Sequence, residues 1–506
     1  MLKDLNKLIF IFILGLAFYL RLHGITNGFP YIFHPDEPTI VRSALGIRFF
    51  PNPGHFDWPH LYIYFNYFVF MAFAKLRDIA VQLDLKTTLE GIFPLLWDDE
   101  LIYYLITRVL TASLGALTVI PVYLTAKKLF GTKAGLMAGL AFALIPFHVR
   151  HTHYSLPDGP MVFLIAWSLY FSVKILQKDD ANNYAGAGAY LGFSASTKYN
   201  GGLAALMIPL AHLMRTIKNK ESIINMNSFL NLLVAVGVAI VAFILGTPYA
   251  VMDYKTFVRT DGPQGALWQF TNVGSVPTSE RPIRFVSEML SRVSDDLGYT
   301  FLAVFFITFI VLIIKAVLRR TLTIDYYAWF IFLYGTFLLA YVSGFGKPRS
   351  HYYMVAYPFI AVLFGYFCAF LYEKLEPKLK TGVFAIYVLL LIVPLYFSVK
   401  QAYIFGNPDT RNTLSLWLKS NISAGTHLVY SSDDFTPIMK EYEKQSEKGL
   451  DKAVKYTTGY VITTETSTQN DQSFGILKYG DKLQKVQTIN NDYNNGPAIV
   501  IYRITR

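Results

Sequence analysis

Cysteine and charge are both scarce in this chain. Among 506 residues there is one cysteine, Cys368, and only 16% of the residues are charged, whereas 53% are hydrophobic. A single cysteine excludes an internal disulfide and a zinc site built from several cysteines. Such low charge, with a mean hydropathy of +0.37, excludes a water-soluble fold for most of the chain. The composition predicts a polytopic membrane protein.

The motifs of several common protein classes are also missing. The sequence contains no Walker-type glycine-lysine loop, no dinucleotide fingerprint and no nucleophile elbow. It shows neither an internal repeat nor a heptad pattern. These absences disfavour ATP-driven transport, hydrolase chemistry on a soluble fold, a solenoid and a coiled coil.

The chain instead contains long apolar runs, which predict a bundle of about 11 membrane spans. Each run approaches the roughly 20 residues needed to cross a bilayer. They lie near 8–22, 101–125, 134–149, 160–176, 182–197, 200–214, 228–248, 298–317, 325–343, 352–371 and 381–398. No small-residue cleavage site follows the first run, so we expect it to stay as a helix. Residues 61–74 are aromatic-rich and interrupted by Asn66, which fits either another span or an interfacial helix.

The distribution of basic residues predicts the orientation of these spans. If residues 61–74 do not cross, the lysine- and arginine-rich short loops all fall on the side of the N-terminus, as the positive-inside rule requires. The net charge of +11 is then explained by orientation and not by nucleic-acid binding. We therefore expect a multi-pass protein of the cell membrane with a cytoplasmic N-terminus.

The chain changes character near residue 400, which divides it into two expected domains. Residues 1–400 form the membrane domain, and residues 401–506 are polar enough for a small outer α/β domain. In that tail we expect a helix at 410–419. The expected strands are 427–430, 460–463, 483–488 and 498–504.

An acidic pair, Asp36 and Glu37, lies in the first outer loop between Pro35 and Pro38. Carboxylates are costly at the mouth of a membrane domain, so chemistry explains them more readily than packing does. One could accept a proton while the other orients a hydroxyl. The alternative is that they cap a helix beginning near Pro38.

A second outer cluster contains His55, Asp57 and His60. Together with the acidic pair these residues could bind a divalent metal, although their spacing matches no strong metal motif. We therefore expect no metal to be required.

A third outer cluster holds three histidines, Arg150 and Asp158 between two predicted spans. In one interpretation Asp158 caps the next helix and the histidines, including His153, lie at the interface. In the other, Asp158 is a second acid that faces Asp36 across a cavity.

Basic residues on the outer side run against the positive-inside bias. They are Lys198 before Gly201, and Lys347 with Arg349 after Gly346. Such residues either bind a phosphate or anchor the protein to lipid headgroups. Arg108 lies inside an apolar run, where it is a functional candidate or one half of a buried ion pair with an acid such as Asp36.

The order of these motifs resembles the C-type membrane glycosyltransferases, and most nearly family 39, which includes the protein O-mannosyltransferases and the aminoarabinose transferases. The stretches that carry the resemblance are His34-Pro-Asp-Glu37, Pro59-His-Leu-Tyr62, Arg108 to Tyr123, His153 to Pro160, Thr197-Lys-Tyr-Asn-Gly201, His351 to Pro358, and the Thr410-Arg411 and Trp417-Leu418 pairs. Pro59-His60 replaces the Pro-Pro of the family pattern, and Trp58 stands where some relatives have lysine.

The resemblance implies an inverting transfer of a sugar from a polyprenyl phosphate to a lipid, glycan or protein acceptor on the outer face. It makes Asp36 the general base, with Glu37 or Asp158 as second acid. The expected phosphate ligands are Arg108, Lys198, Lys347 and Arg349. The expected pocket residues are His34, His60, His153, Tyr199, His351 and Tyr352.

A lipid-linked sugar flippase or secondary transporter is the competing class. A transporter would place ionisable groups near the bilayer midplane and often has two related halves. Here the ionisable groups gather at one face and no repeat is seen.

Overall fold

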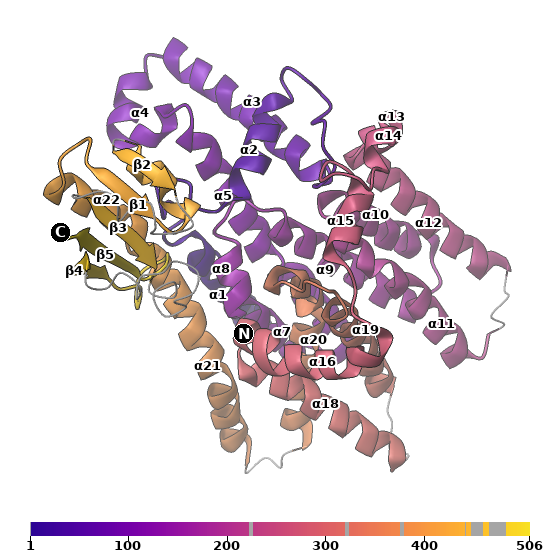
Figure 1. Ribbon diagram of the computed structural model, residues 1–506. Coiled ribbons are helices and arrows are strands. Elements are labelled where there is room, and N and C mark those ends of the chain that lie inside the picture. Colours follow the sequence, from indigo (N-terminus) through magenta and orange to yellow (C-terminus); the bar gives the residue numbers. More distant parts are fainter. Residues whose placement is uncertain are drawn as a thin grey trace. The chain divides into compact units, whose positions relative to one another are not determined.

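The computed structural model describes residues 2–221, 226–318, 323–374, 379–440, 442–446, 459–464 and 482–505. These residues form mostly helices (Figure 1). Two compact units can be separated, one of Met1–Leu22 with Asp36–Val399, the other of His23–Pro35 with Lys400–Arg506. Residues 23–35, which the sequence grouped with the membrane domain, thus cluster with the C-terminal unit.

Each predicted apolar run of the first unit is mostly helical. The helices are α1 (Leu2–Leu22), α5 (Leu101–Leu117), α6 (Val119–Phe130), α7 (Thr132–Ala143), α8 (Pro146–His151), α9 (Asp158–Gln177), α10 (Ala181–Thr197), α11 (Met207–Asn219), α12 (Met226–Gly246), α18 (Tyr299–Val317), α19 (Thr323–Ser343), α20 (Tyr357–Lys374) and α21 (Lys380–Gly406). Within the described residues, eight helical stretches are long and apolar enough to cross a membrane. The expectation of a polytopic helical membrane protein is confirmed.

The aromatic-rich run 61–74 belongs to α3 (Leu61–Gln82), which is not among those eight stretches. Asn66 is fully buried in this helix and donates a hydrogen bond from Nδ2 to the carbonyl of Tyr62, 2.7 Å away. The short helices α2 (Glu37–Gly46) and α4 (Lys86–Ile92) flank α3 in the chain.

Close packing of α10 against α12 holds one wall of the site in place. A Cβ atom at Gly188 would lie 2.2 Å from the carbonyl oxygen of Ala235, and one at Gly192 would lie 2.1 Å from that of Ala239. Two glycines four residues apart let the helix backbones approach as closely as small residues do in membrane helix pairs. Because α10 is fixed in this way, Lys198 at its C-cap is fixed too.

The connection between α12 and α18 folds into short helices, which are α13 (Tyr249–Met252), α14 (Tyr254–Phe257), α15 (Ala266–Val273), α16 (Arg281–Glu288), the π-helix η4 (Met289–Val293) and α17 (Ser294–Leu297). An isolated antiparallel bridge joins Ser275 to Phe345. The amide of Val276 donates to the carbonyl of Gly344 at 2.9 Å, and that of Gly346 donates to Gly274 at 3.1 Å. The bridge draws the loop after α15 beside the loop that precedes the 3-10 helix η5 (Ser350–Ala356).

The C-terminal unit is a five-stranded sheet with helix α22 (Thr410–Asn421). The strands are β1 (His427–Tyr430), β2 (Glu443–Ser446), β3 (Tyr460–Thr464), β4 (Leu483–Ile489) and β5 (Ile499–Ile504), in the order β2-β1-β3-β5-β4. β1 is parallel to β2 and β3, whereas β5 is antiparallel to β3 and β4. The predicted helix and four strands are confirmed. The polar sequence of β2 gave no strand signal.

Candidate active site

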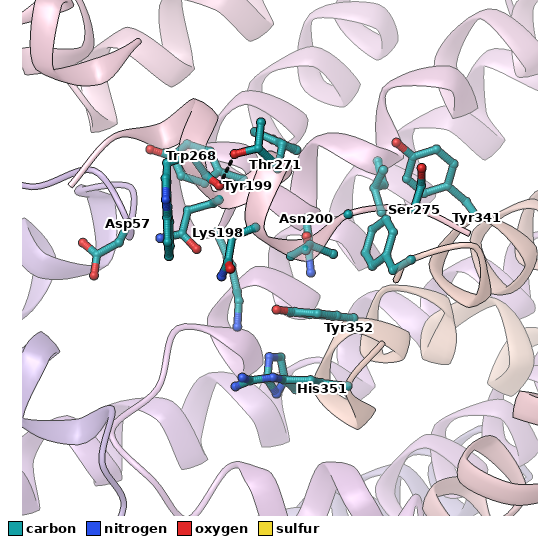
Figure 2. Close-up of a pocket in the computed structure, with 18 of the residues that line it drawn as sticks. Asp57, Lys198, Tyr199, Asn200, Trp268, Thr271, Ser275, Tyr341, His351 and Tyr352 are labelled. Carbon is teal, nitrogen blue, oxygen red and sulfur yellow. Dashed lines mark hydrogen bonds between the residues drawn. The ribbon is translucent and has the colours of Figure 1, made fainter. Parts of the chain in front are cut away.

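A cavity of about 730 Å³ opens within the first unit (Figure 2). Its wall is assembled from the start of α2, the loop before α3, η2 (Tyr199–Leu206), α15, the start of α16, the end of α19 and η5. The polar and aromatic lining residues include Asp36, Asp57, Trp58, Lys198, Tyr199, Asn200, Trp268, Arg281, Tyr341, Arg349, His351 and Tyr352.

Asp36 occupies the N-cap position of α2 and lines the cavity. Its side chain accepts no capping hydrogen bond from that helix. Pro38 in the first turn has no amide hydrogen, so α2 can begin at this point without a complete cap. The carboxylate therefore faces the cavity without serving as the cap that the sequence offered as an alternative.

Glu37 and Arg108 lie elsewhere and pair with each other. Nε of Arg108 donates to Oε1 of Glu37 at 2.7 Å, and its terminal Nη2 donates to Oε2 at 2.8 Å. The amide of Ser155 also donates to Oε1 at 2.8 Å. Both side chains are buried and neither lines the cavity. Glu37 and Arg108 therefore form a buried ion pair outside the cavity. This placement does not agree with the catalytic role expected of Glu37 or with the phosphate-binding role expected of Arg108.

Asp158, the second expected acid, is buried behind the cavity wall. Its two oxygens accept hydrogen bonds from Nζ of Lys198 at 2.7 and 2.8 Å, and Nε2 of His151 lies 3.2 Å from Oδ2. Figure 2 shows Lys198 in the middle of the cavity, with Tyr352 and His351 below it. The His351 ring stacks on His151, with ring centroids 5.5 Å apart. Asp158 therefore reaches the cavity through Lys198.

Arg349 lines the cavity as expected, but Lys347 does not. The exposed Nζ of Lys347 donates to Oδ1 of Asn272 at 3.4 Å. Arg281, the first residue of α16, lines the cavity in its place. Sequence reasoning missed Arg281, although this basic residue lies in the long connection between the expected spans 228–248 and 298–317.

Three of the six expected pocket residues line the cavity, namely Tyr199, His351 and Tyr352. His60 does not. Its ring stacks on Phe56 at 4.7 Å between centroids, and burial lowers its pKa to about 4. His153 is buried, with Nδ1 2.8 Å from the carbonyl of Val149. His34 belongs to the C-terminal unit.

The histidine and aspartate side chains proposed as metal ligands are engaged with one another and with the backbone. Nδ1 of His55 is bonded to Oδ1 of Asp57, while Nε2 of His60 lies 2.9 Å from the carbonyl of His55. Within the described ranges no group of three or more histidine, cysteine or acidic side chains is placed to hold a metal ion. A metal-free reaction stays a prediction.

Comparison with known proteins shows that part of the chain is similar to one described family. The sequence pattern of the dolichyl-phosphate-mannose-protein mannosyltransferases matches residues 104–247. The yeast Saccharomyces cerevisiae dolichyl-phosphate-mannose–protein mannosyltransferase 1 is 31% identical over 163 residues, which are 29% of this chain and 18% of the yeast protein. The chain thus aligns with under a fifth of that relative's length.

Two solved structures share the fold. ArnT from Cupriavidus metallidurans bound to undecaprenyl phosphate superposes with a TM-score of 0.53 at 13% identity, covering 98% of this chain and 97% of that one. The archaeal oligosaccharyltransferase AglB from Archaeoglobus fulgidus, in complex with an inhibitory peptide and a dolichol-phosphate, gives 0.53 at 13% identity, covering 91% and 69%. The two structural matches show the fold, and the family model and the yeast relative are similar to part of the chain, in agreement with the resemblance found in the motifs.

Proposed function

We propose that the cavity binds a polyprenyl-phosphate sugar and transfers the sugar, with inversion, to a hydroxyl of an acceptor. The observation that carries the proposal is the meeting of a carboxylate, Asp36, with three basic side chains, Lys198, Arg281 and Arg349, in a cavity that Asp57 also lines. A glycosyl transfer needs both kinds of group. The carboxylate can take the proton that the attacking group loses, and the basic side chains can stabilise the negative charge that the leaving phosphate gains.

In the proposed reaction the acceptor oxygen attacks the anomeric carbon from the face opposite the phosphate. Asp36 takes the proton of the attacking hydroxyl as the new C–O bond forms. The bond between the anomeric carbon and the phosphate oxygen breaks, and its electron pair stays on the phosphate. One displacement at one carbon inverts its configuration.

The basic residues differ in how much of their charge is left for a phosphate. Lys198 is already paired with Asp158. Arg281 and Arg349 form no ion pair with any residue that the structure describes. We assign the leaving phosphate mainly to these two arginines, whose guanidinium groups can each donate two parallel hydrogen bonds. Lys198 adds a positive charge held in place by Asp158.

The proposal includes the sidedness expected from the basic loops, with the cavity on the outer face and the N-terminus in the cytoplasm. The undecaprenyl phosphate bound to ArnT and the dolichol-phosphate bound to AglB support a lipid-phosphate donor for this chain as well. The acceptor is a lipid, a glycan or a protein with a free hydroxyl.

Asp36→Asn tests the assignment of the base. The variant retains shape and an acceptor oxygen but cannot take the proton, so we expect sugar transfer to fall by at least about 100-fold. Transfer is measured as consumption of a radiolabelled polyprenyl-phosphate sugar by the purified protein in lipid. Asp433→Asn, in η7 (Asp433–Met439) of the C-terminal unit, is the matched control. Activity of Asp36→Asn within about tenfold of wild type, a barrier change of only ~1.4 kcal/mol, would remove Asp36 from this role.

A further inference from the structure

A hydrogen-bonded series of three side chains ends in the cavity at Asp57. Oγ of Ser43, on α2, lies 2.9 Å from Nε2 of His55, and Nδ1 of the same ring is bonded to Oδ1 of Asp57. Asp57 lines the cavity, whereas Ser43 and His55 do not. The proposed transfer uses Asp36 as its base and leaves Asp57 without a role.

The loop that carries Asp57 is anchored on several sides. The amide of Phe56 donates to the carbonyl of Gln264 at 2.6 Å, and the hydroxyl of Tyr199 donates to the carbonyl of Phe56 at 2.8 Å. Phe56 is fully buried. The amide of His60 donates to Oγ1 of Thr247 at 3.2 Å. Groups fixed by such contacts lose little freedom when a ligand binds, which favours recognition over a merely solvated surface role.

The surroundings of Asp57 suit a sugar. Its neighbour Trp58 and the more distant Trp268 present indole rings to the same cavity, and the ammonium of Lys198 lies 4.9 Å from the centre of the Trp58 ring. Figure 2 places Asp57 and Tyr341 at opposite ends of the view, with Lys198 between them. A carboxylate has about four acceptor positions, and His55 occupies only one oxygen. The remaining positions can accept hydrogen bonds from two hydroxyls, while the indoles cover apolar C–H faces.

We propose that Asp57 is a sugar-recognition residue that accepts hydrogen bonds from neighbouring hydroxyls of a pyranose or pentose, and that His55 and Ser43 position it. The inference rests on the proposed function and deepens it. The sugar is either the one carried by the donor lipid or one on a glycan acceptor, since the hydroxyl chemistry is the same. His55 and Ser43 are positioning residues because they act only through Asp57.

The test compares lipids with and without a sugar. The full-length protein in lipid nanodiscs is titrated with sugar-free undecaprenyl phosphate and with its mannosyl, glucosyl and arabinosyl forms, and binding is followed by native mass spectrometry. We expect Asp57→Asn to raise the Kd of the preferred sugar-bearing lipid at least about tenfold and to leave that of undecaprenyl phosphate unchanged. Asp253→Asn is the matched control, because Asp253 is bonded to Asn52 at 3.0 Å outside the cavity.

Measurements of sugar transfer distinguish a sugar on the donor lipid from a sugar on the glycan acceptor. If Asp57 holds a sugar of the acceptor, Asp57→Asn keeps donor affinity and donor hydrolysis by water but loses transfer to the glycan. An equal loss of affinity for sugar-free and sugar-bearing lipids would overturn the inference, as would wild-type affinity and transfer in the variant. Failure of the wild-type protein to bind undecaprenyl phosphate would instead count against the proposed function itself.

Two substitutions of His55 distinguish positioning from structural support. Asn places its amide nitrogen near the position of Nδ1 and so keeps the bond to Asp57, whereas Gln places its nitrogen near Nε2 and keeps only the bond to Ser43. We expect His55→Asn to retain most of the sugar discrimination and His55→Gln to lose it, at similar melting temperatures. Equal discrimination in both variants would show that His55 does not act through Asp57.

Discussion

Nζ of Lys198 lies 2.7 Å from one oxygen of Asp158 and 2.8 Å from the other, and both side chains are buried. Asp158 and Lys198, which the sequence presented as separate candidates for an acid and a phosphate ligand, therefore form one ion pair. Asp158 fixes the lysine, and the lysine presents its charge to the cavity. The pair costs less than an isolated buried charge would, because each ion is neutralised by the other.

Arg349→Ala should lower both turnover and donor affinity, with a loss in kcat/KM of about 10- to 1,000-fold. Hydrogen bonds from a guanidinium strengthen as charge develops on the leaving phosphate, so they favour the transition state over the ground state. Arg349→Lys should recover only part of the loss, since an ammonium cannot donate the paired bonds. Initial rates of sugar transfer over a range of donor concentrations measure both parameters.

Lys347→Ala is the control for Arg349, since it removes a nearby charge that does not line the cavity. We expect it to stay within about threefold of wild type, and Arg281→Ala to behave like Arg349→Ala. A larger defect in Lys347→Ala than in Arg349→Ala would contradict the placement of the phosphate.

Arg108→Met should destabilise the protein by about 3–5 kcal/mol, because it removes the cation that neutralises the buried carboxylate of Glu37. The double variant with Glu37→Gln should recover much of this loss. Thermal unfolding in detergent measures the effect. Arg42→Met is the control, since Arg42 lies 3.9 Å from Glu100 in an exposed pair worth at most about 1 kcal/mol. Wild-type stability in Arg108→Met, with donor affinity lost, would restore the phosphate role.

Asp296 should make stability depend on pH. Burial raises the pKa of Asp296 to about 7, although Ser350 and nearby arginines act in the opposite direction. A folded pKa above the unfolded value of ~3.9 stabilises the fold most at low pH, and this contribution disappears as pH rises through 7. Between pH 5 and pH 8 we expect a loss of roughly 2–3 kcal/mol.

Asp296→Asn should flatten this dependence and raise the melting temperature at pH 8. Asp295→Asn, a change at the exposed neighbouring acid, should leave the dependence as in wild type. Identical pH profiles for Asp296→Asn and wild type, recorded by thermal unfolding, would show that Asp296 is ionised in the fold at neutral pH.

Single cysteines test the proposed sidedness in a Cys368→Ala background. Ala181, the first residue of α10, and Thr278, between α15 and α16, are both exposed and are expected on opposite sides of the membrane. In sealed cells an impermeant thiol reagent should label Thr278→Cys and spare Ala181→Cys. The reverse pattern would put the cavity on the cytoplasmic side.

The sequence by itself determined where the helices and most strands lie. Bilayer thickness sets the length of an apolar run, so runs such as 228–248 and 325–343 were recognisable from composition alone and became α12 and α19. The strand at 498–504 was recognisable because it is rich in β-branched residues and follows Pro497. Both signals are local, and no partner elsewhere in the chain is needed to detect them.

Only the tertiary structure decided which charged residues share the cavity. Glu37 meets Arg108 across 71 positions and Asp158 meets Lys198 across 40. Arg281 and Arg349 line one cavity whose wall includes the bridge between Ser275 and Phe345. Lys347 and Arg349 are two positions apart, yet only Arg349 lines the cavity. Such outcomes depend on helix packing and side-chain direction, which a local pattern does not contain.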